Sequence, residues 1–187
     1  MAIKMSDEII DYVKIPKDRI AVLIGKKGTT KAKIEKYIGI KLSIDSDDGL
    51  VTIIVPPEPK DPLAILKAKN IVKAIGRGFS PKDALFLLED SYLLEVIDLR
   101  EYELTKKAMI RQKGRVIGSE GSMKIAIEKF LNVKLAIYGK TISIIGERDN
   151  VIAARNMVER ILTGTPQSAV MHMLERKRME LLGGEFY

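Results

Sequence analysis

The sequence of 187 residues has no cysteine, no tryptophan and a single histidine, His172. Without cysteine the fold cannot use disulfides, and one imidazole cannot build a zinc site of the usual Cys/His kind. A Ser-His-Asp triad would depend on His172, which lies between two methionines and is expected to be an ordinary helix residue. Since no nucleophile–base pair or metal cluster is visible, the sequence predicts a protein that is not an enzyme and uses no cofactor.

Long apolar runs are also missing. No stretch approaches the roughly 20 residues of a membrane span, and the N-terminal MAIKMSDEII lacks the apolar core of a signal peptide. These absences predict a soluble, cytoplasmic protein with no membrane partner. Charge is abundant, because 32 Lys and Arg against 25 Asp and Glu give a net charge of +7. Such an excess favours acidic partners, nucleic acid first.

An internal repeat organises the chain. The segment from Gly25 to Ile44 returns as Gly118 to Ile137 at an offset of 93 without a gap, and nine of the 20 positions are identical. A second match relates residues 68–75 to residues 154–161 at a shorter offset. Two matches in the same order imply a duplicated domain of about 70 residues.

Each copy is predicted to contain the same elements, from apolar periodicity and from turn residues. In the first copy these are strand 9–15, helices 16–24 and 29–38, strands 40–44 and 50–55, and a helix from Pro62 with an apolar stripe of Leu63, Leu66, Ile71 and Ile75. In the second they are strand 93–99, helix 106–117, a helix ending at Leu131, strands 133–138 and 141–145, and helix 149–162.

The predicted class is therefore α+β, with two tandem units of β-α-α-β-β-α order. Each unit is expected to form a three-stranded antiparallel sheet with three helices on one face. The expected domains are residues 1–78 and 91–164, joined by a short helical linker at 79–90 and followed by a C-terminal segment, 165–187, with a helix at about 169–182.

A Gly-x-x-Gly loop joins the first two helices of each copy, at Gly25-Lys26-Lys27-Gly28 and at Gly118-Ser119-Glu120-Gly121. A phosphodiester can approach a backbone closely only where no side chain intervenes. A loop that opens a helix also presents free N–H groups and the positive end of the helix dipole. A single Gly-x-x-Gly motif is also found where two helices are joined by an ordinary turn, but its duplication here with the same flanking elements favours phosphate binding. The acidic Glu120 leaves open that the second loop is a purely structural copy.

Basic and apolar side chains around the loops complete the predicted site. Lys31 and Lys124 share one repeat position in a first helical turn, where a cation opposes the helix dipole. An anionic ligand would explain them, and shared ancestry without a role is the alternative. The basic run from Lys106 to Arg115 leads into the second loop and predicts a phosphate track. The predicted nucleic-acid-binding residues are Val22, Ile24, Gly25, Lys26, Lys27, Gly28, Lys31, Ile44, Arg111, Lys113, Arg115, Val116, Ile117, Gly118, Ser119, Gly121, Lys124 and Ile137. The element order resembles that of KH domains, and this resemblance implies that Val22, Ile24, Ile44, Val116, Ile117 and Ile137 line apolar grooves for the bases.

This element order resembles the KH domain of the eukaryotic-type topology, whose Gly-x-x-Gly loop clamps about four nucleotides. Both copies read Gly-x-x-Gly-x-x-Lys-x-x-Ile-Glu, with Lys where most KH domains carry Ile. Together with Lys113-Gly-Arg-Val-Ile-Gly118 and the junction Gly76-Arg-Gly-Phe-Ser-Pro81, this departure is similar to the archaeal form of the partner-of-Nob family, which are two-KH ribosome-assembly proteins. The resemblance extends from about residue 9 to residue 178.

The resemblance implies a role in maturing the small ribosomal subunit. It implies binding of single-stranded RNA near the 3′ end of the small-subunit rRNA, in support of the Nob endonuclease that trims it. Contacts with the initiation factor two alpha subunit and with a Rio-type kinase are further implications. Two other functions stay open on the residues alone: a KH regulator of transcription or mRNA, and a scaffold that mainly contacts ribosomal or initiation proteins. Since Glu120 departs from the Gly or Lys usual in the family, which domain dominates the RNA affinity also stays open.

Overall fold

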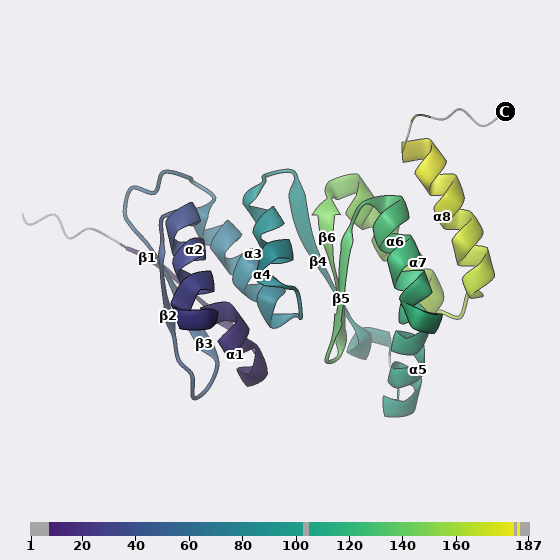
Figure 1. The fold of residues 1–187 in the computed structure, drawn as a ribbon, viewed down its shortest axis with the longest axis horizontal. Helices are drawn as coiled ribbons and strands as arrows, with labels where there is room; N and C mark the ends of the chain where they lie inside the picture. The colour runs from purple at the N-terminus through teal and green to yellow at the C-terminus, as the bar shows by residue number, and fades with distance from the viewer. Residues whose placement is uncertain (1–7, 103–104, 182, 184–187) are drawn as a thin grey trace, which may run out of the picture. The chain divides into compact units, whose positions relative to one another are not determined.

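The computed structural model describes residues 8–102, 105–181 and 183, which divide into two compact units, Met1–Glu89 and Asp90–Tyr187 (Figure 1). The first seven residues of the first predicted domain lie outside the described residues. The same holds for residue 182, the predicted end of the C-terminal helix. In the part of the chain that is described, no helix has the length and apolar character needed to cross a membrane.

The first unit has the predicted order of elements. They are β1 (Ile9–Lys14), α1 (Lys17–Ile24), a 3-10 turn (Lys26–Gly28), α2 (Thr29–Ile38), β2 (Lys41–Ile44), β3 (Leu50–Val55), α3 (Ala64–Gly76), α4 (Pro81–Ala84) and a second 3-10 turn (Leu85–Leu88). Pro16 stands immediately before α1, where its fixed φ suits a helix start. Gly39 ends α2 in the left-handed conformation, as a glycine C-cap commonly does.

The second unit repeats this order and adds one helix. Its elements are β4 (Tyr92–Asp98), a 3-10 turn (Leu99–Tyr102), α5 (Lys106–Ile117), another 3-10 turn (Ser119–Gly121), α6 (Ser122–Leu131), β5 (Lys134–Tyr138), β6 (Thr141–Glu147), α7 (Arg148–Leu162) and α8 (Gln167–Leu181). Thr105 caps α5, since its hydroxyl accepts a hydrogen bond from the Ala108 N–H at 3.2 Å.

Each unit holds one antiparallel sheet, ordered β1-β3-β2 in the first and β4-β6-β5 in the second. The two registers are equivalent: the Ile15 N–H donates to the Gly49 carbonyl at 2.9 Å, and the Leu99 N–H donates to the Lys140 carbonyl at the same distance. The first strands therefore correspond at an offset of 84, which makes Asp11 the counterpart of Glu95.

The helices of each unit cover one face of its sheet (Figure 1). On that face of the first sheet, Val13 lies opposite Val51, and Leu42 lies opposite Ile53, all of them buried. The second sheet buries the equivalent residues Ile97, Ile142, Leu135 and Ile144. The predicted α+β class, with two tandem β-α-α-β-β-α units, is confirmed.

The predicted apolar stripe of α3 is wrong at its start. Leu63 precedes the helix and is 45% exposed, and Leu66 is 50% exposed. The buried face instead begins with two alanines and continues with larger residues: Ala64, Ala68, Ile71, Val72 and Ile75. The small alanines let α3 approach the sheet closely, so the largest apolar residues at its start are not the ones that are covered.

Two segments outside the repeats pack onto the hydrophobic cores that the repeats form. Residues 79–89 of the predicted linker 79–90 bury Phe79, Ala84 and Leu87, and both α4 and the turn after it lie on α3. Helix α8 packs on α6 and α7 and buries Val170 and Leu174. These apolar side chains tie the first segment to the first core and α8 to the second.

Candidate nucleic-acid interface

The two Gly-x-x-Gly loops differ in sequence but share one backbone conformation. The first glycines have φ/ψ of 74°/171° at Gly25 and 76°/172° at Gly118. Lys27 and Glu120, at the third position, are both left-handed, with φ of 52° and 51°. The last glycines, Gly28 and Gly121, have φ of 77° and 79°. The exchange of Lys-Lys for Ser-Glu therefore changes the charge of the second loop and not its shape.

The two glycines of each loop have different roles. A Cβ on Gly25 would lie 2.3 Å from Thr30 Oγ1, and a Cβ on Gly118 would lie 2.7 Å from the backbone nitrogen of Met123. A Cβ on Gly28, in contrast, would have no neighbour within 4 Å among the described residues, and a Cβ on Gly121 would meet only Ile125 Cδ1, at an ordinary contact distance of 3.7 Å. The first glycine thus permits the loop to close onto the next helix, and the second leaves open surface where a phosphate can approach.

Both loops lead directly into an N-terminus that faces an open surface. Gly28 precedes α2 and Gly121 precedes α6, and within the described residues no side chain caps either helix. The first turn of a helix has N–H groups without intrahelical partners, and the helix dipole adds positive potential there. Each loop therefore presents the elements of an anion-binding site.

A repeated glutamate holds the helix after each loop against a strand. Glu35 Oε1 accepts a hydrogen bond from the Leu42 N–H at 2.8 Å, and Glu128 Oε1 accepts one from the Leu135 N–H at 2.8 Å. Glu35 also lies 3.8 Å from Lys31 Nζ. Sequence reasoning missed this role, although identity at the same repeat position was a signal for it. The two carboxylates therefore have a structural role, and Glu35 partly neutralises the positive charge of Lys31 at the start of α2.

The predicted apolar groove residues are half-buried, except that Ile117 is exposed and Val116 is buried. Val22, Ile24, Ile44 and Ile137 are partly accessible, and Ile117 is 38% exposed. Val116 is fully buried in the core of the second unit and does not line a groove. At the offset of 93 it corresponds to Leu23, which is fully buried too. Because the helix turns by 100° per residue, the position next to Ile117 faces the core.

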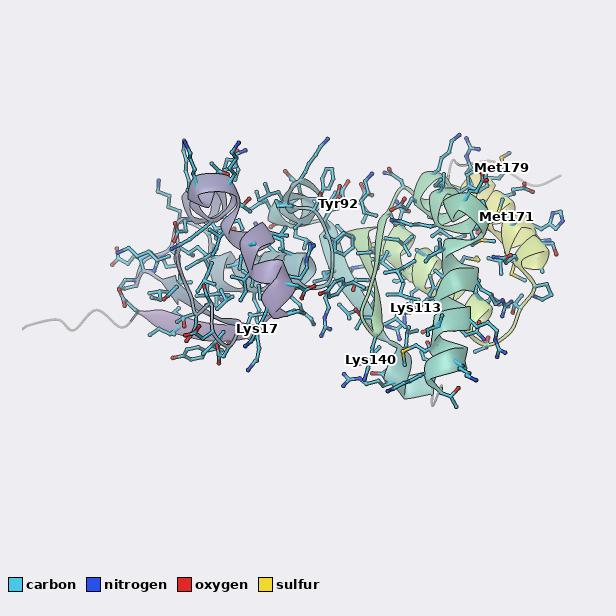
Figure 2. All side chains as sticks on the ribbon, turned by 60° about the horizontal axis from the view of Figure 1, so that its bottom comes forward. Lys17, Tyr92, Lys113, Lys140, Met171 and Met179 are labelled. Carbon is cyan, nitrogen blue, oxygen red and sulfur yellow. The ribbon has the colours of Figure 1, made fainter. Side chains whose placement is uncertain are left out.

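The predicted phosphate track on α5 splits into accessible and engaged cations. Lys106, Lys107 and Arg111 are exposed. Lys113 Nζ donates to the Gly139 carbonyl at 2.9 Å, in the turn that also carries Lys140 (Figure 2). Arg115 donates to the carbonyls of residues 161 and 165, at 2.9 and 2.5 Å. Arg115 therefore ties α5 to the end of α7, and its guanidinium is not directed at a ligand.

The first unit has an equivalent contact between an arginine and the end of its last repeat helix, but the arginine comes from a different position of the repeat. Arg19 Nε donates to the Ile75 carbonyl at 2.8 Å, and its Nη2 donates to the Phe79 carbonyl at 2.7 Å. Ile75 corresponds to Ile161, yet at the offset of 93 Arg19 corresponds to Gln112 rather than to Arg115. Each copy thus uses an arginine to satisfy carbonyls at the end of its last repeat helix. No local pattern signals a contact across 56 residues.

We predict that Arg115→Leu destabilises the fold with little effect on RNA binding. Loss of two charge-assisted hydrogen bonds leaves the carbonyls of Ile161 and Thr165 with fewer partners, which costs about 2 kcal/mol. Urea unfolding measures this cost. The exposed Arg111→Leu is the matched control and should change stability by less than about 0.5 kcal/mol, while weakening RNA binding. If Arg115→Leu instead weakened RNA binding and left stability unchanged, Arg115 would belong to the binding surface.

The comparisons with known proteins agree with this geometry. Residues 93–179 match the eukaryotic-type KH domain (KH-domain type I) represented by the second domain of PNO1, and residues 12–90 match the first KH domain of Krr1. A KH domain-containing protein of Methanocaldococcus jannaschii is 47% identical over 180 residues, which are 96% of this chain and 79% of that protein. The chain belongs to the Pno1/Dim2 family of two-KH proteins. The predicted partner-of-Nob family is thereby confirmed.

Solved structures of Pno1/Dim2 proteins extend the match. Dim2p from Pyrococcus horikoshii superposes with a TM-score of 0.84 at 46% identity, covering 90% of this chain and 99% of that one. A chain in the a/eIF2alpha-aDim2p-rRNA complex of the same organism gives a TM-score of 0.87 at 44% identity, covering 92% and 96%. The RNA-binding protein pno1 of Dictyostelium discoideum is 26% identical over 166 residues, 88% of this chain and 70% of that protein.

Proposed function

We propose that this protein is a ribosome-assembly factor without catalytic activity that holds single-stranded rRNA near the 3′ end of the small-subunit rRNA, with one KH groove in each domain. The observation that carries the proposal is the shared backbone conformation of the two loops, each placed before an uncapped helix and with little or no side chain over its second glycine. The RNA-binding proteins among its relatives and the rRNA complex of a structural neighbour support the same ligand.

Each part of the proposed site has a distinct role. The backbone of residues 25–28 and 118–121 binds phosphates, and the cations Lys26, Lys27, Lys31, Lys124, Arg111 and Lys113 add positive charge. The half-buried apolar residues Val22, Ile24, Ile44, Ile117 and Ile137 contact the bases. Among the described residues, no group of three or more His, Cys, Asp or Glu is placed to hold a metal ion. The protein would act by presenting RNA to a partner enzyme.

The proposed partners follow from that role. The structural neighbour is a complex with the alpha subunit of initiation factor two, which supports a contact of the same kind here. We extend the proposal to a Nob-type endonuclease, whose substrate this protein would hold, and to a Rio-type kinase. A role on the small subunit also implies a cytoplasmic location.

Reversing the charge of the first loop should weaken RNA binding. Lys26→Asp with Lys27→Asp places two anions beside the bound phosphate, so we expect at least a tenfold loss of affinity, about 1.4 kcal/mol. Both side chains are exposed, so the fold should survive. The matched control reverses Lys36 and Lys60, two exposed lysines outside the loop. Titration of a fluorescent oligonucleotide measures both, and an unchanged affinity in the folded loop variant would remove this loop from the site.

The affinity should depend steeply on salt. Each phosphate contact contributes about −0.7 to the slope of log K against log salt for single strands. Contacts at two loops and on α5 predict a slope steeper than about −2. A salt series on the intact chain measures it. A slope near zero would mean that apolar grooves and stacking carry the affinity.

RNA recovered after cross-linking in cells tests the biological part of the proposal. Reads concentrated at the 3′ end of the small-subunit rRNA are the expected result. A mixture of mRNAs would favour a transcription or mRNA regulator instead. Recovery of ribosomal or initiation proteins without RNA would favour a scaffold.

A further inference from the structure

A second basic site lies in the first domain, away from its Gly-x-x-Gly loop. An open pocket of ≈ 520 Å³ lies between β1 and the second half of α3. Its lining includes Tyr12, Lys14, Lys69, Lys73 and Arg77 and no acidic residue. Strand β1 is one of the two outer strands of its sheet, so the pocket opens along a sheet edge.

Ion pairs neutralise only part of this charge. Lys69 Nζ lies 2.7 Å from Asp11 Oδ2, and this hydrogen bond, with that of the Tyr12 N–H, holds the pKa of Asp11 below its usual value. Lys14 lies 3.7 Å from Asp48, and both side chains are at least half exposed, so this pair is weak. Lys73 and Arg77 have no carboxylate within ion-pair distance among the described residues, and they leave the pocket positively charged.

The second domain shows which residues the same fold carries at the positions of this pocket. The pair of Asp11 with Lys69 recurs there as Glu95 with Arg155, which supports the alignment of the two pockets. Beyond that pair, the second domain lacks the cations and the aromatic ring of the first. Lys14 is replaced by Asp98, Lys73 by Glu159, Arg77 by Thr163, and Tyr12 by Val96. One fold accepts both sets of residues, so folding does not require the cations of the first domain.

The helix dipole does not explain the difference either. Cations near a helix C-terminus are stabilising, and Lys73 and Arg77 lie at the end of α3. However, α7 places Glu159 and Thr163 at the same positions, and Glu159 there accepts a hydrogen bond from Arg155 Nε at 2.8 Å. The equivalent helix end is therefore compatible with an acid, and the helix dipole does not account for the cations of the first domain.

We propose that this pocket binds a further segment of single-stranded RNA, with phosphates at Lys73, Arg77 and Lys14 and a base stacked on the ring of Tyr12. Tyr12 is 57% exposed, and an exposed ring beside cations is the combination that single-stranded nucleic acid uses. An acidic peptide would use the cations but not the ring. The proposal shares its ligand class with the proposed function but not its site.

A tryptophan reporter tests the site in the full chain. Since the chain has no tryptophan, Tyr12→Trp introduces a single one. Oligouridylate of about ten nucleotides should quench its fluorescence by stacking. Lys73→Glu with Arg77→Thr installs the residues of the second domain and should raise the midpoint of quenching at least tenfold. Lys36→Glu with Lys60→Thr makes the same change of charge at exposed sites and should leave the midpoint within about twofold.

The loop variant separates this site from the proposed function. In the background of Lys26→Asp with Lys27→Asp, quenching should persist even as total RNA affinity falls. Loss of quenching in that background would overturn the pocket and leave the loop proposal standing. Quenching that persists while total affinity is unchanged would support the pocket and contradict the loop.

Amide chemical shifts in the unmodified chain provide the measurement that does not depend on the reporter. Oligouridylate should shift the amides of Lys73 and Arg77. Their failure to move would overturn the proposal. A response to oligoglutamate but not to RNA would also overturn it, in favour of an acidic protein partner.

Discussion

A single strand of about ten nucleotides should bind the intact chain at least 10²-fold more tightly than either half of that strand. Each KH groove takes only about four nucleotides, so one domain alone should bind weakly. A second groove with a Kd of about 10 µM, held at an effective concentration of about 1 mM, adds about 100-fold. The two units adjoin in sequence at Glu89 and Asp90, without a separate spacer.

The structure decides how this expectation is best tested. Cutting the chain near Ser80 would separate Phe79 from Ala84 and Leu87, and all three are buried. Disabling one loop at a time keeps both cores intact. Gly28→Asp and Gly121→Asp place an anion on the open side of each loop. Each should reduce affinity for the long strand to that of the short ones, as measured by titration with both lengths.

Unequal losses would identify the dominant domain. If Gly121→Asp leaves long-strand affinity unchanged, the second domain does not contact this RNA, and the acidic Glu120 loop is a structural copy. Glu120→Lys is the complementary variant, because the residue already has the left-handed backbone and is exposed. If the loop does bind phosphate, this substitution should increase affinity severalfold.

Gly25→Ala should cost about 3 kcal/mol of stability and at least tenfold in RNA affinity. The new Cβ would lie 2.7 Å from the backbone nitrogen of Thr30 and closer still to its hydroxyl, and a backbone atom cannot move aside cheaply. The φ of +74° with ψ of 171° adds strain, because that region is open essentially to glycine alone. Urea unfolding and RNA titration measure the two losses.

Gly28→Ala is the matched control for that experiment. Gly28 also has a positive φ, of +77°, but a Cβ there would have no neighbour within 4 Å among the described residues. Its ψ of 10° places it in the left-handed region, which the preceding non-glycine residue, Lys27, also adopts. The expected cost is about 1 kcal/mol. Equal destabilisation by both alanines would show that the close approach to Thr30 does not shape the loop.

The sequence by itself determined the fold class, the duplication and the two loops. These features are local: the β-branched residues at 50–55 predict β3, and glycines separated by two residues predict the turn before α2. Since the side-chain period of a helix or strand depends only on neighbouring residues, such patterns can be recognised before any contact is known. The repeat strengthened them, because a second copy tests each interpretation of the first.

Only the tertiary structure decided which side chains are free to bind. Val116 and Ile117 are adjacent in sequence, but one is buried and the other is 38% exposed. In the sequence Arg115 belongs to a predicted phosphate track, but in the structure it donates to the carbonyls of Ile161, in α7, and Thr165, just after it. The basic pocket joins Tyr12 to Arg77, 65 residues apart. The physical reason is the same throughout: burial and pairing depend on the surface that packs against a residue, and that surface comes from distant parts of the chain.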